Sequence, residues 1–345
     1  MKKLWMTALL STAILAACGS TEEDTANEVN ANDNKATEAE ATIDGTVSFY
    51  TSQPEADATK FISESNDLYP EIEVELFRSG TEEVVGKILA ENTAGDIQAD
   101  VLLLADHVTF ENLKNQDLLE SYDSPEKENI SEEFIDKDLT YYGTKVMATV
   151  IGYNTDAVTE APTSWSVLTE KANETIMPSP LYSGAAAYNL GIFTRNDHFG
   201  WDYYKALKEG KATVVQGNGA ALKGLQAGEN NYAMIVDYLV NNAAKEGSPI
   251  AITYPEEGVP VITEPIALVK DAQDKKAAQA FIDFVLSKEG QELAASLGYA
   301  PIRSDVTAPE GLKGVDELNV LLSSVEELYN GRESDKNEFK TLFGE

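Results

Sequence analysis

Residues 261–269 read VITEPIALV, a mostly apolar run late in the chain. We interpret it as a strand that returns to an α/β unit begun much earlier in the chain, and the run at residues 146–153, VMATVIGY, as the strand that leaves that unit. Two such crossings predict two lobes: residues 43–148 plus 262–345 form lobe 1, and residues 149–261 form an inserted lobe 2. Two connections make a hinge, so we expect a ligand to be trapped when the lobes close.

The rest of the sequence alternates strands with helices, which is typical of an α/β fold. The run at residues 99–104, ADVLLL, is almost continuously apolar, as expected for a strand buried on both faces of a parallel sheet. Ser52 with Glu55, and Ser79 with Glu82, have the spacing of capping boxes and predict the starts of two helices. Further strands are predicted at residues 46–50, 72–77, 175–177, 212–215, 232–235 and 250–254.

The first 42 residues have the pattern of an exported lipoprotein. A basic start precedes a short apolar segment, which ends in Leu-Ala-Ala-Cys at residues 15–18. This pattern predicts a signal peptide over residues 1–17 and lipid attachment to Cys18, the only cysteine. Residues 18–42 are acidic and poor in large apolar side chains, which predicts a disordered tether. We therefore expect the chain to lie outside the cytoplasm, anchored to the cell membrane by lipid.

Charge and motif content argue against several classes of function. The formal net charge of -33 disfavours nucleic acid, because that binding depends on Lys and Arg. Ser183 lies in Tyr-Ser-Gly-Ala rather than in the Gly-x-Ser-x-Gly turn of hydrolases. The GNG at residues 217–219 is followed by Leu222 where the dinucleotide fingerprint needs glycine. We expect neither an enzyme nor a bound cofactor, and we expect a monomer.

Several stretches are similar to one family of binding proteins. They are AFIDFVLSKEGQE at residues 280–292, GYAPIR at 298–303, ADV at 99–101, YSGAA at 182–186 and GNGAAL at 217–222. These stretches resemble the solute-binding proteins of ATP-binding-cassette (ABC) importers, in the ferric-binding-protein-like group. The resemblance implies a type II periplasmic-binding-protein fold and a permease in the membrane as the partner.

The resemblance also implies a ferric ligand set that this sequence departs from. Ferric members coordinate iron with a His, a Glu and two adjacent Tyr; here those positions are Pro54, Ala105 and the pair Tyr238-Leu239. A hard ferric ion needs several anionic oxygen ligands. A replacement set of Asp106, His107, Asp237 and Tyr238 keeps ferric iron as the alternative ligand.

The anion shell of the same family is better matched. The matching residues are Ser183, Gly184, Ala185 and Asn218. Helix N-termini bind anions through free N–H groups and the positive end of the helix dipole. Ser52, and Ser79 with Thr81, are predicted at helix starts on the opposite lobe. Asp237, next to Tyr238, suits the amine of a zwitterion or a sugar hydroxyl.

These observations predict a receptor that captures a small anionic solute and delivers it to an ABC permease. The ligand class is an organophosphate or phosphonate, such as 2-aminoethylphosphonate or a sugar phosphate. Ferric iron is the first alternative. An adhesion or sensory lipoprotein on the same fold is an alternative of another class, because a fold does not fix a function.

Overall fold

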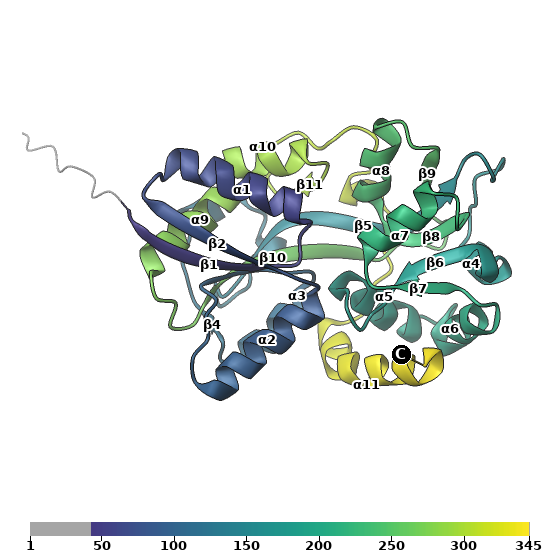
Figure 1. Ribbon diagram of the computed structural model, residues 1–345, viewed down its shortest axis with the longest axis horizontal. Coiled ribbons are helices and arrows are strands. Elements are labelled where there is room, and N and C mark those ends of the chain that lie inside the picture. Colours follow the sequence, from purple (N-terminus) through teal and green to yellow (C-terminus); the bar gives the residue numbers. More distant parts are fainter. Residues whose placement is uncertain (1–42, 345) are drawn as a thin grey trace, which may run out of the picture. The chain divides into compact units, whose positions relative to one another are not determined.

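The structure, a computed structural model, describes residues 43–344 (Figure 1). The predicted signal peptide at residues 1–17, the lipid attachment at Cys18 and the tether at residues 18–42 lie outside the described residues and stay predictions. None of the described helices is long and apolar enough to span a bilayer.

The first half of the sheet is built from the N-terminal part of the chain. Its parallel strands are β1 (Gly45–Thr51), β2 (Ile72–Arg78) and β3 (Val101–Leu103), in the order β2-β1-β3. The helices that follow these strands are α1 (Glu55–Leu68), α2 (Thr81–Ala94) and α3 (His107–Asn115). The alternation of buried strands and helices confirms the predicted α/β class.

The second half of the sheet comes from the middle of the chain. Its strands are β5 (Tyr142–Asn154), β6 (Thr175–Pro178), β7 (Thr213–Val215), β8 (Tyr232–Val236) and β9 (Ile250–Thr253), in the order β5-β8-β6-β7, with β9 also paired to β5. Its helices are α4 (Ser166–Glu170), α5 (Gly184–Arg195), α6 (Gly200–Glu209), α7 (Asn218–Gln226) and α8 (Asp237–Lys245).

Two long strands join the halves. β10 (Val261–Val269) pairs with β3, with the short β4 (Leu119–Glu120) and with the first part of β5. The rest of β5, from Thr149 onward, pairs with β8 and β9. Figure 1 shows both strands running from one half to the other. This pairing supports our proposal that residues 149–261 form an inserted lobe.

The C-terminal part returns to the first half and then leaves it. Helices α9 (Lys275–Leu286) and α10 (Lys288–Ser296) precede the short β11 (Ala300–Pro301), which pairs with β5. The last helix, α11 (Val325–Phe343), packs against α5 and α6 as well as α3. It is therefore not confined to the lobe that we predicted for residues 262–345.

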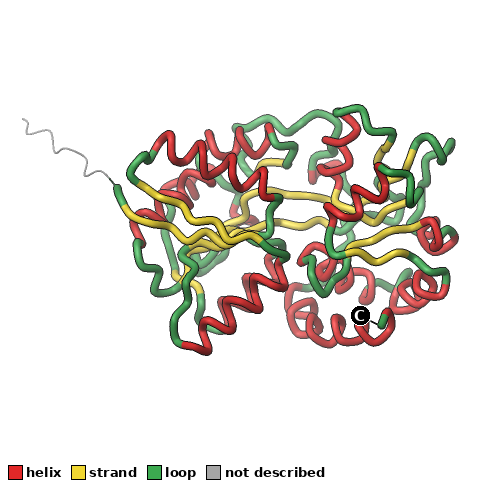
Figure 2. Tube along the Cα trace, in the orientation of Figure 1, coloured by secondary structure: helices red, strands yellow, loops and turns green. Residues whose placement is uncertain are grey.

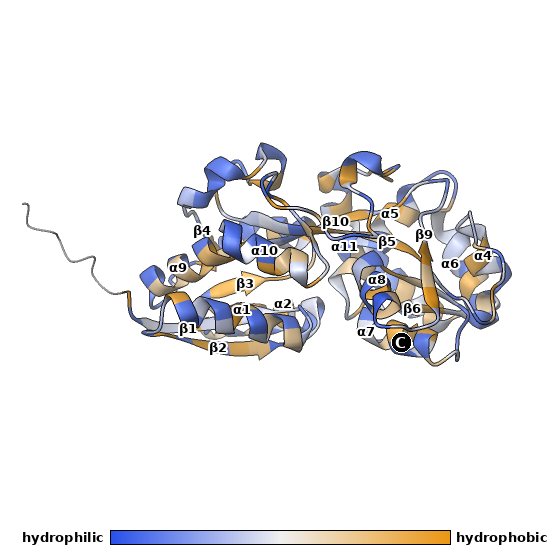
Figure 3. Ribbon diagram, turned by 90° about the horizontal axis from the view of Figure 1, so that it is seen from above, coloured by the Kyte–Doolittle hydropathy of each residue, from blue (hydrophilic) through white to orange (hydrophobic). Residues whose placement is uncertain are grey.

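Each half has its own aromatic packing within a core between strands and helices. In the first half the rings of Phe49 and Phe281 meet edge to face, with centroids 4.9 Å apart. In the second half Trp165 packs against Phe193 at 5.1 Å and donates its indole N–H to the carbonyl of Gly258 at 2.7 Å. Helices lie on both sides of the strands (Figure 2), and buried strands such as β3 are strongly hydrophobic (Figure 3). The starts of several of these helices lie around one pocket.

Candidate ligand-binding site

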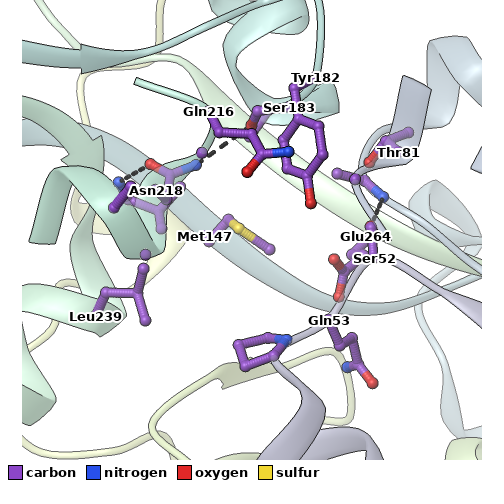
Figure 4. A pocket seen from close by; sticks show the side chains of 18 of the residues that line it. Ser52, Gln53, Thr81, Met147, Tyr182, Ser183, Gln216, Asn218, Leu239 and Glu264 are labelled. Atoms are coloured by element: carbon purple, nitrogen blue, oxygen red, sulfur yellow. Dashed lines mark hydrogen bonds between the residues drawn. The ribbon is translucent and has the colours of Figure 1, made fainter. Parts of the chain in front are cut away.

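A pocket of about 430 Å³ lies between residues of the two halves (Figure 4). Its lining residues are Ser52, Gln53, Pro54, Arg78, Gly80, Thr81, Ala105, Met147, Tyr182, Ser183, Ala185, Gln216, Gly217, Asn218, Gly219, Ala220, Lys223, Val236, Tyr238, Leu239 and Glu264. The volume is within the range of small-molecule sites in proteins.

Among the described residues, five helices begin at this pocket: α1 begins directly after Pro54, which lines it, and four others line it with a cap or first-turn residue. The starts of α2, α5, α7 and α8 line it with Thr81, Ser183, Asn218 and Tyr238 respectively. The first turn of a helix has N–H groups without intrahelical partners, and the helix dipole is positive at that end. The convergence of four such ends favours a negatively charged ligand.

Side chains hold three of these helix starts together. Ser183 caps α5 by accepting a hydrogen bond from the N–H of Ala186 at 3.3 Å. The Asn218 amide donates to the Ser183 hydroxyl at 3.4 Å and accepts from the N–H of Val236 at 3.2 Å. Val236 is the residue before α8, so one amide ties α5, α7 and α8 into a fixed arrangement (Figure 4).

Six of the nine predicted ligand residues line the pocket. They are Ser52, Thr81, Ser183, Ala185, Asn218 and Tyr238. Ser79, Gly184 and Asp237 are not among the lining residues. A role in binding for the six residues is a proposal that this placement supports.

The two predicted capping boxes are wrong. Helix α1 begins after Pro54, whose fixed φ suits a helix start, so Ser52 lies outside the helix. The Ser52 hydroxyl instead accepts from the N–H of Ala105 at 3.2 Å and ties the end of β1 to the end of β3. Helix α2 begins after Gly80, and the Ser79 hydroxyl donates to the Glu83 side chain.

Gly184 lies where the two halves touch. A Cβ atom at this position would lie 2.8 Å from the carbonyl oxygen of Ala105 and 2.9 Å from Cβ of Thr81. Close by, the N–H of Glu82 donates to the carbonyl of Tyr182 at 3.3 Å. The glycine therefore permits close approach between the starts of α2 and α5, and its predicted place in an anion-binding shell stays a prediction.

Asp237 turns away from the pocket. Its carboxylate accepts from the N–H groups of Ala148 at 3.2 Å and Tyr238 at 2.8 Å, and from the Tyr254 hydroxyl at 3.2 Å. Burial raises the pKa of Asp237 to about 6. These hydrogen bonds join the carboxylate to β5, α8 and Tyr254, and its contact with a ligand amine or hydroxyl stays a prediction.

The raised pKa of Asp237 predicts a pH-dependent loss of stability. Asp237 ionises near pH 4 in the unfolded chain and near pH 6 in the fold. Its contribution to the free energy of unfolding is therefore largest below pH 4 and is lost as the pH rises through 6. Asp237→Asn removes this ionisation and keeps a carbonyl acceptor. Relative to wild type, we expect it to gain about 3 kcal/mol of unfolding free energy between pH 4 and pH 7.5. Urea denaturation at both pH values measures this gain; the exposed Asp202→Asn is the control, and an equal pH dependence in wild type and Asp237→Asn would refute the assignment.

The predicted replacement set for iron does not assemble around the pocket. Asp106 caps α3 by accepting from the N–H of Thr109, and its other oxygen pairs with Arg332 at 2.9 Å. Tyr238 lines the pocket, and its hydroxyl accepts from the Tyr299 hydroxyl at 3.2 Å. Burial raises the pKa of Tyr238, which disfavours the tyrosinate that ferric iron requires.

His107 is half-buried and packs against an aromatic ring. Its ring meets the ring of Tyr188 edge to face at 5.4 Å, and burial lowers its pKa. Within residues 43–344, no group of three or more His, Cys, Asp or Glu side chains is placed to hold a metal ion.

Three charged residues of the pocket were missed by sequence reasoning. Arg78 ends β2 and donates from Nε to the carbonyl of Gln53 at 2.8 Å, while Lys223 lies further along α7. Glu264 lies inside β10, and a charged residue within an otherwise apolar strand is a signal that the sequence contained. Arg78 and Lys223 put positive charge at the pocket of a chain whose net charge is -33.

An α/β fold in two halves, with a pocket between them and two connecting strands, defines the class of two-lobed solute-binding proteins. Residues 96–319 match the sequence model of the family described as bacterial extracellular solute-binding protein, and the chain belongs to that family. The class of function that follows is solute binding for an ABC importer.

Known proteins with similar sequences or structures support the same fold. An uncharacterized protein of Haemophilus influenzae is 24% identical over 295 residues, which cover 81% of this chain and 83% of that protein. The periplasmic binding protein AfuA from Actinobacillus pleuropneumoniae, solved with fructose-6-phosphate bound, superposes with a TM-score of 0.81 at 20% identity, covering 87% of this chain and 99% of AfuA. Iron-bound HitA from Pseudomonas aeruginosa superposes with a TM-score of 0.75 at 21% identity, covering 85% and 99%. These similarities confirm the predicted two-lobed fold.

Proposed function

We propose that this protein captures a small solute through a phosphate or phosphonate group and delivers it to an ABC permease. The observation that carries the proposal is the convergence of the starts of α2, α5, α7 and α8 on one pocket. Phosphate oxygens accept several N–H donors at once, and the positive helix ends favour the charge. Lipid attachment at Cys18 is part of the proposal and would hold the receptor at the membrane that contains the permease.

The charged side chains of the pocket support the same ligand class. Arg78 and Lys223 add two cations to the helix ends. Glu264 brings one negative charge to the pocket, and the buried Lys145 forms an ion pair with it. The balance of charge at the pocket is therefore positive, which suits an anion and opposes capture of a free ferric ion.

Capture would require the two halves to move. The starts of α2 and α5, one from each half, are in contact beside the pocket, and separating them would open a wider path for a ligand. Each half supplies only some of the donors, and a ligand that binds both halves therefore favours the closed state.

The test removes single donors from the start of α5. Ser183→Ala removes a hydroxyl and a helix cap, and we expect it to weaken binding by about 1–3 kcal/mol, or roughly 5- to 150-fold. Ala185→Pro deletes a backbone N–H in the first helical turn, where proline is tolerated, and we expect a larger loss. Calorimetry with inorganic phosphate, fructose-6-phosphate and 2-aminoethylphosphonate measures the affinities.

Ser324→Ala is the matched control. Ser324 caps α11 in the same way, by accepting from the N–H of Glu327 at 3.1 Å, and it is not among the residues that line the pocket. This variant should lose stability and keep wild-type affinity. Unchanged affinity in folded Ala185→Pro would overturn the helix-start site.

A further inference from the structure

Glu264 is the only acidic residue among those that line the pocket. It lies in β10, at an irregularity of the pairing with β5 between Glu264 and Pro265. Its side chain is buried, and Figure 4 shows the carboxylate facing the interior of the pocket. The negative charge of this buried carboxylate would by itself repel an anionic ligand, so its surroundings matter.

The charge of Glu264 is compensated by Lys145. The two residues are partners across the β5–β10 ladder, and the Lys145 ammonium contacts the Glu264 carboxylate. Lys145 is 1% exposed and lies over the ring of Tyr299 at 4.6 Å. The pair therefore presents carboxylate oxygen to the pocket without net negative charge.

This compensation discriminates between two kinds of ligand. An ammonium group near Glu264 would also meet the field of Lys145, Arg78 and Lys223, and it would lose its hydration without a net countercharge. Asp237, which could have supplied that countercharge, faces β5 and Tyr254 instead. A hydroxyl group has no charge to desolvate and donates a strong hydrogen bond to an ionised acceptor.

The rest of the pocket has room and surface for more than an inorganic anion. One water molecule occupies about 30 Å³ of liquid, so a pocket of about 430 Å³ has space for a ligand much larger than phosphate. Tyr182, Met147 and Leu239 provide apolar surface next to the helix starts (Figure 4). Such surface suits the C–H faces of a polyol.

We infer that the ligand is a phosphate ester of a polyol, such as a sugar phosphate, and that Glu264 accepts a hydrogen bond from one of its hydroxyl groups. Glu264 and Lys145 together then determine specificity against ligands that carry an ammonium group. This inference rests on the proposed function, since the phosphate at the helix starts places the polyol near Glu264.

The first arm of the test compares ligands on the wild-type protein by calorimetry. Fructose-6-phosphate should bind at least tenfold more tightly than inorganic phosphate, and 2-aminoethylphosphonate should bind no more tightly than ethylphosphonate, which lacks the ammonium group. A tenfold preference for 2-aminoethylphosphonate over ethylphosphonate would overturn the inference and leave the helix-start site standing. If no phosphate or phosphonate binds at all, both the inference and the proposed function fail.

The second arm compares variants. In Glu264→Gln the ratio of the fructose-6-phosphate affinity to the inorganic phosphate affinity should fall at least fivefold, because a neutral amide is a weaker acceptor. Glu120→Gln is the control: Glu120 pairs with Lys275 at 3.1 Å and does not line the pocket, so the ratio should stay at the wild-type value. A wild-type ratio in folded Glu264→Gln would overturn the role of this carboxylate, and circular dichroism confirms folding.

Discussion

Replacing Arg332 with methionine is expected to lower the free energy of unfolding by about 3–5 kcal/mol, because it leaves the buried Asp106 carboxylate without its cation. Arg332 on α11 pairs with Asp106 at 2.9 Å and with Glu82 at 3.0 Å. Asp106 is fully buried. Burial alone would lower the pKa of Arg332, but the two carboxylates outweigh it and raise that pKa.

Urea denaturation of Arg332→Met measures this loss. The double variant Asp106→Asn with Arg332→Met removes the unpaired charge on Asp106 and should recover part of the stability, which a double-mutant comparison isolates. Lys205→Met is the control, because its pair with Asp202 is largely exposed and such pairs contribute at most about 1 kcal/mol. A loss in Arg332→Met as small as the loss in Lys205→Met would contradict the buried network.

Replacing Gly184 with alanine is expected to weaken ligand binding by about 5- to 150-fold while leaving the protein folded. The added Cβ would lie 2.8 Å from the carbonyl oxygen of Ala105 and 2.9 Å from Thr81, both in the opposite half. Overpacking of this kind costs about 1–3 kcal/mol, and here the cost falls on the closed state. Alanine favours the helix itself, so the stability of α5 should not fall.

Calorimetry and small-angle scattering test this expectation together. The scattering of wild-type protein should show compaction with saturating ligand, and Gly184→Ala should compact less at equal saturation. Gly86→Ala is the matched control, because a Cβ at that helical glycine meets no atom within 4 Å. Equal affinity and equal compaction in Gly184→Ala and wild type would show that this contact does not limit closure.

The architecture could be predicted because its signals are local. Each predicted strand coincides with an observed strand to within a few residues, since apolar runs and alternation depend on neighbours in the sequence. The crossing strands were visible as the two apolar runs that became β5 and β10. Helix starts were less predictable. Helices α1 and α2 begin after Pro54 and Gly80, and not at the serines that have capping-box spacing.

The site was predictable only in part because side-chain direction depends on distant residues. Ser183 was found because a cap and its helix are neighbours in the sequence. The orientation of Asp237 depends on Ala148 in β5 and on Tyr254, and no local pattern reports those contacts. Likewise, the pair of Lys145 with Glu264 exists only through the register of β5 and β10.

Native mass spectrometry of the protein purified from its own cells, with phosphorus NMR on the released compound, shows whether the bound solute contains a phosphate or phosphonate group. We expect a bound small molecule that contains phosphate or phosphonate, and we expect that molecule to be lost in the Ala185→Pro variant. A bound metal ion with no phosphorus compound, retained in Ala185→Pro, would show that the helix starts do not bind a phosphate or phosphonate group.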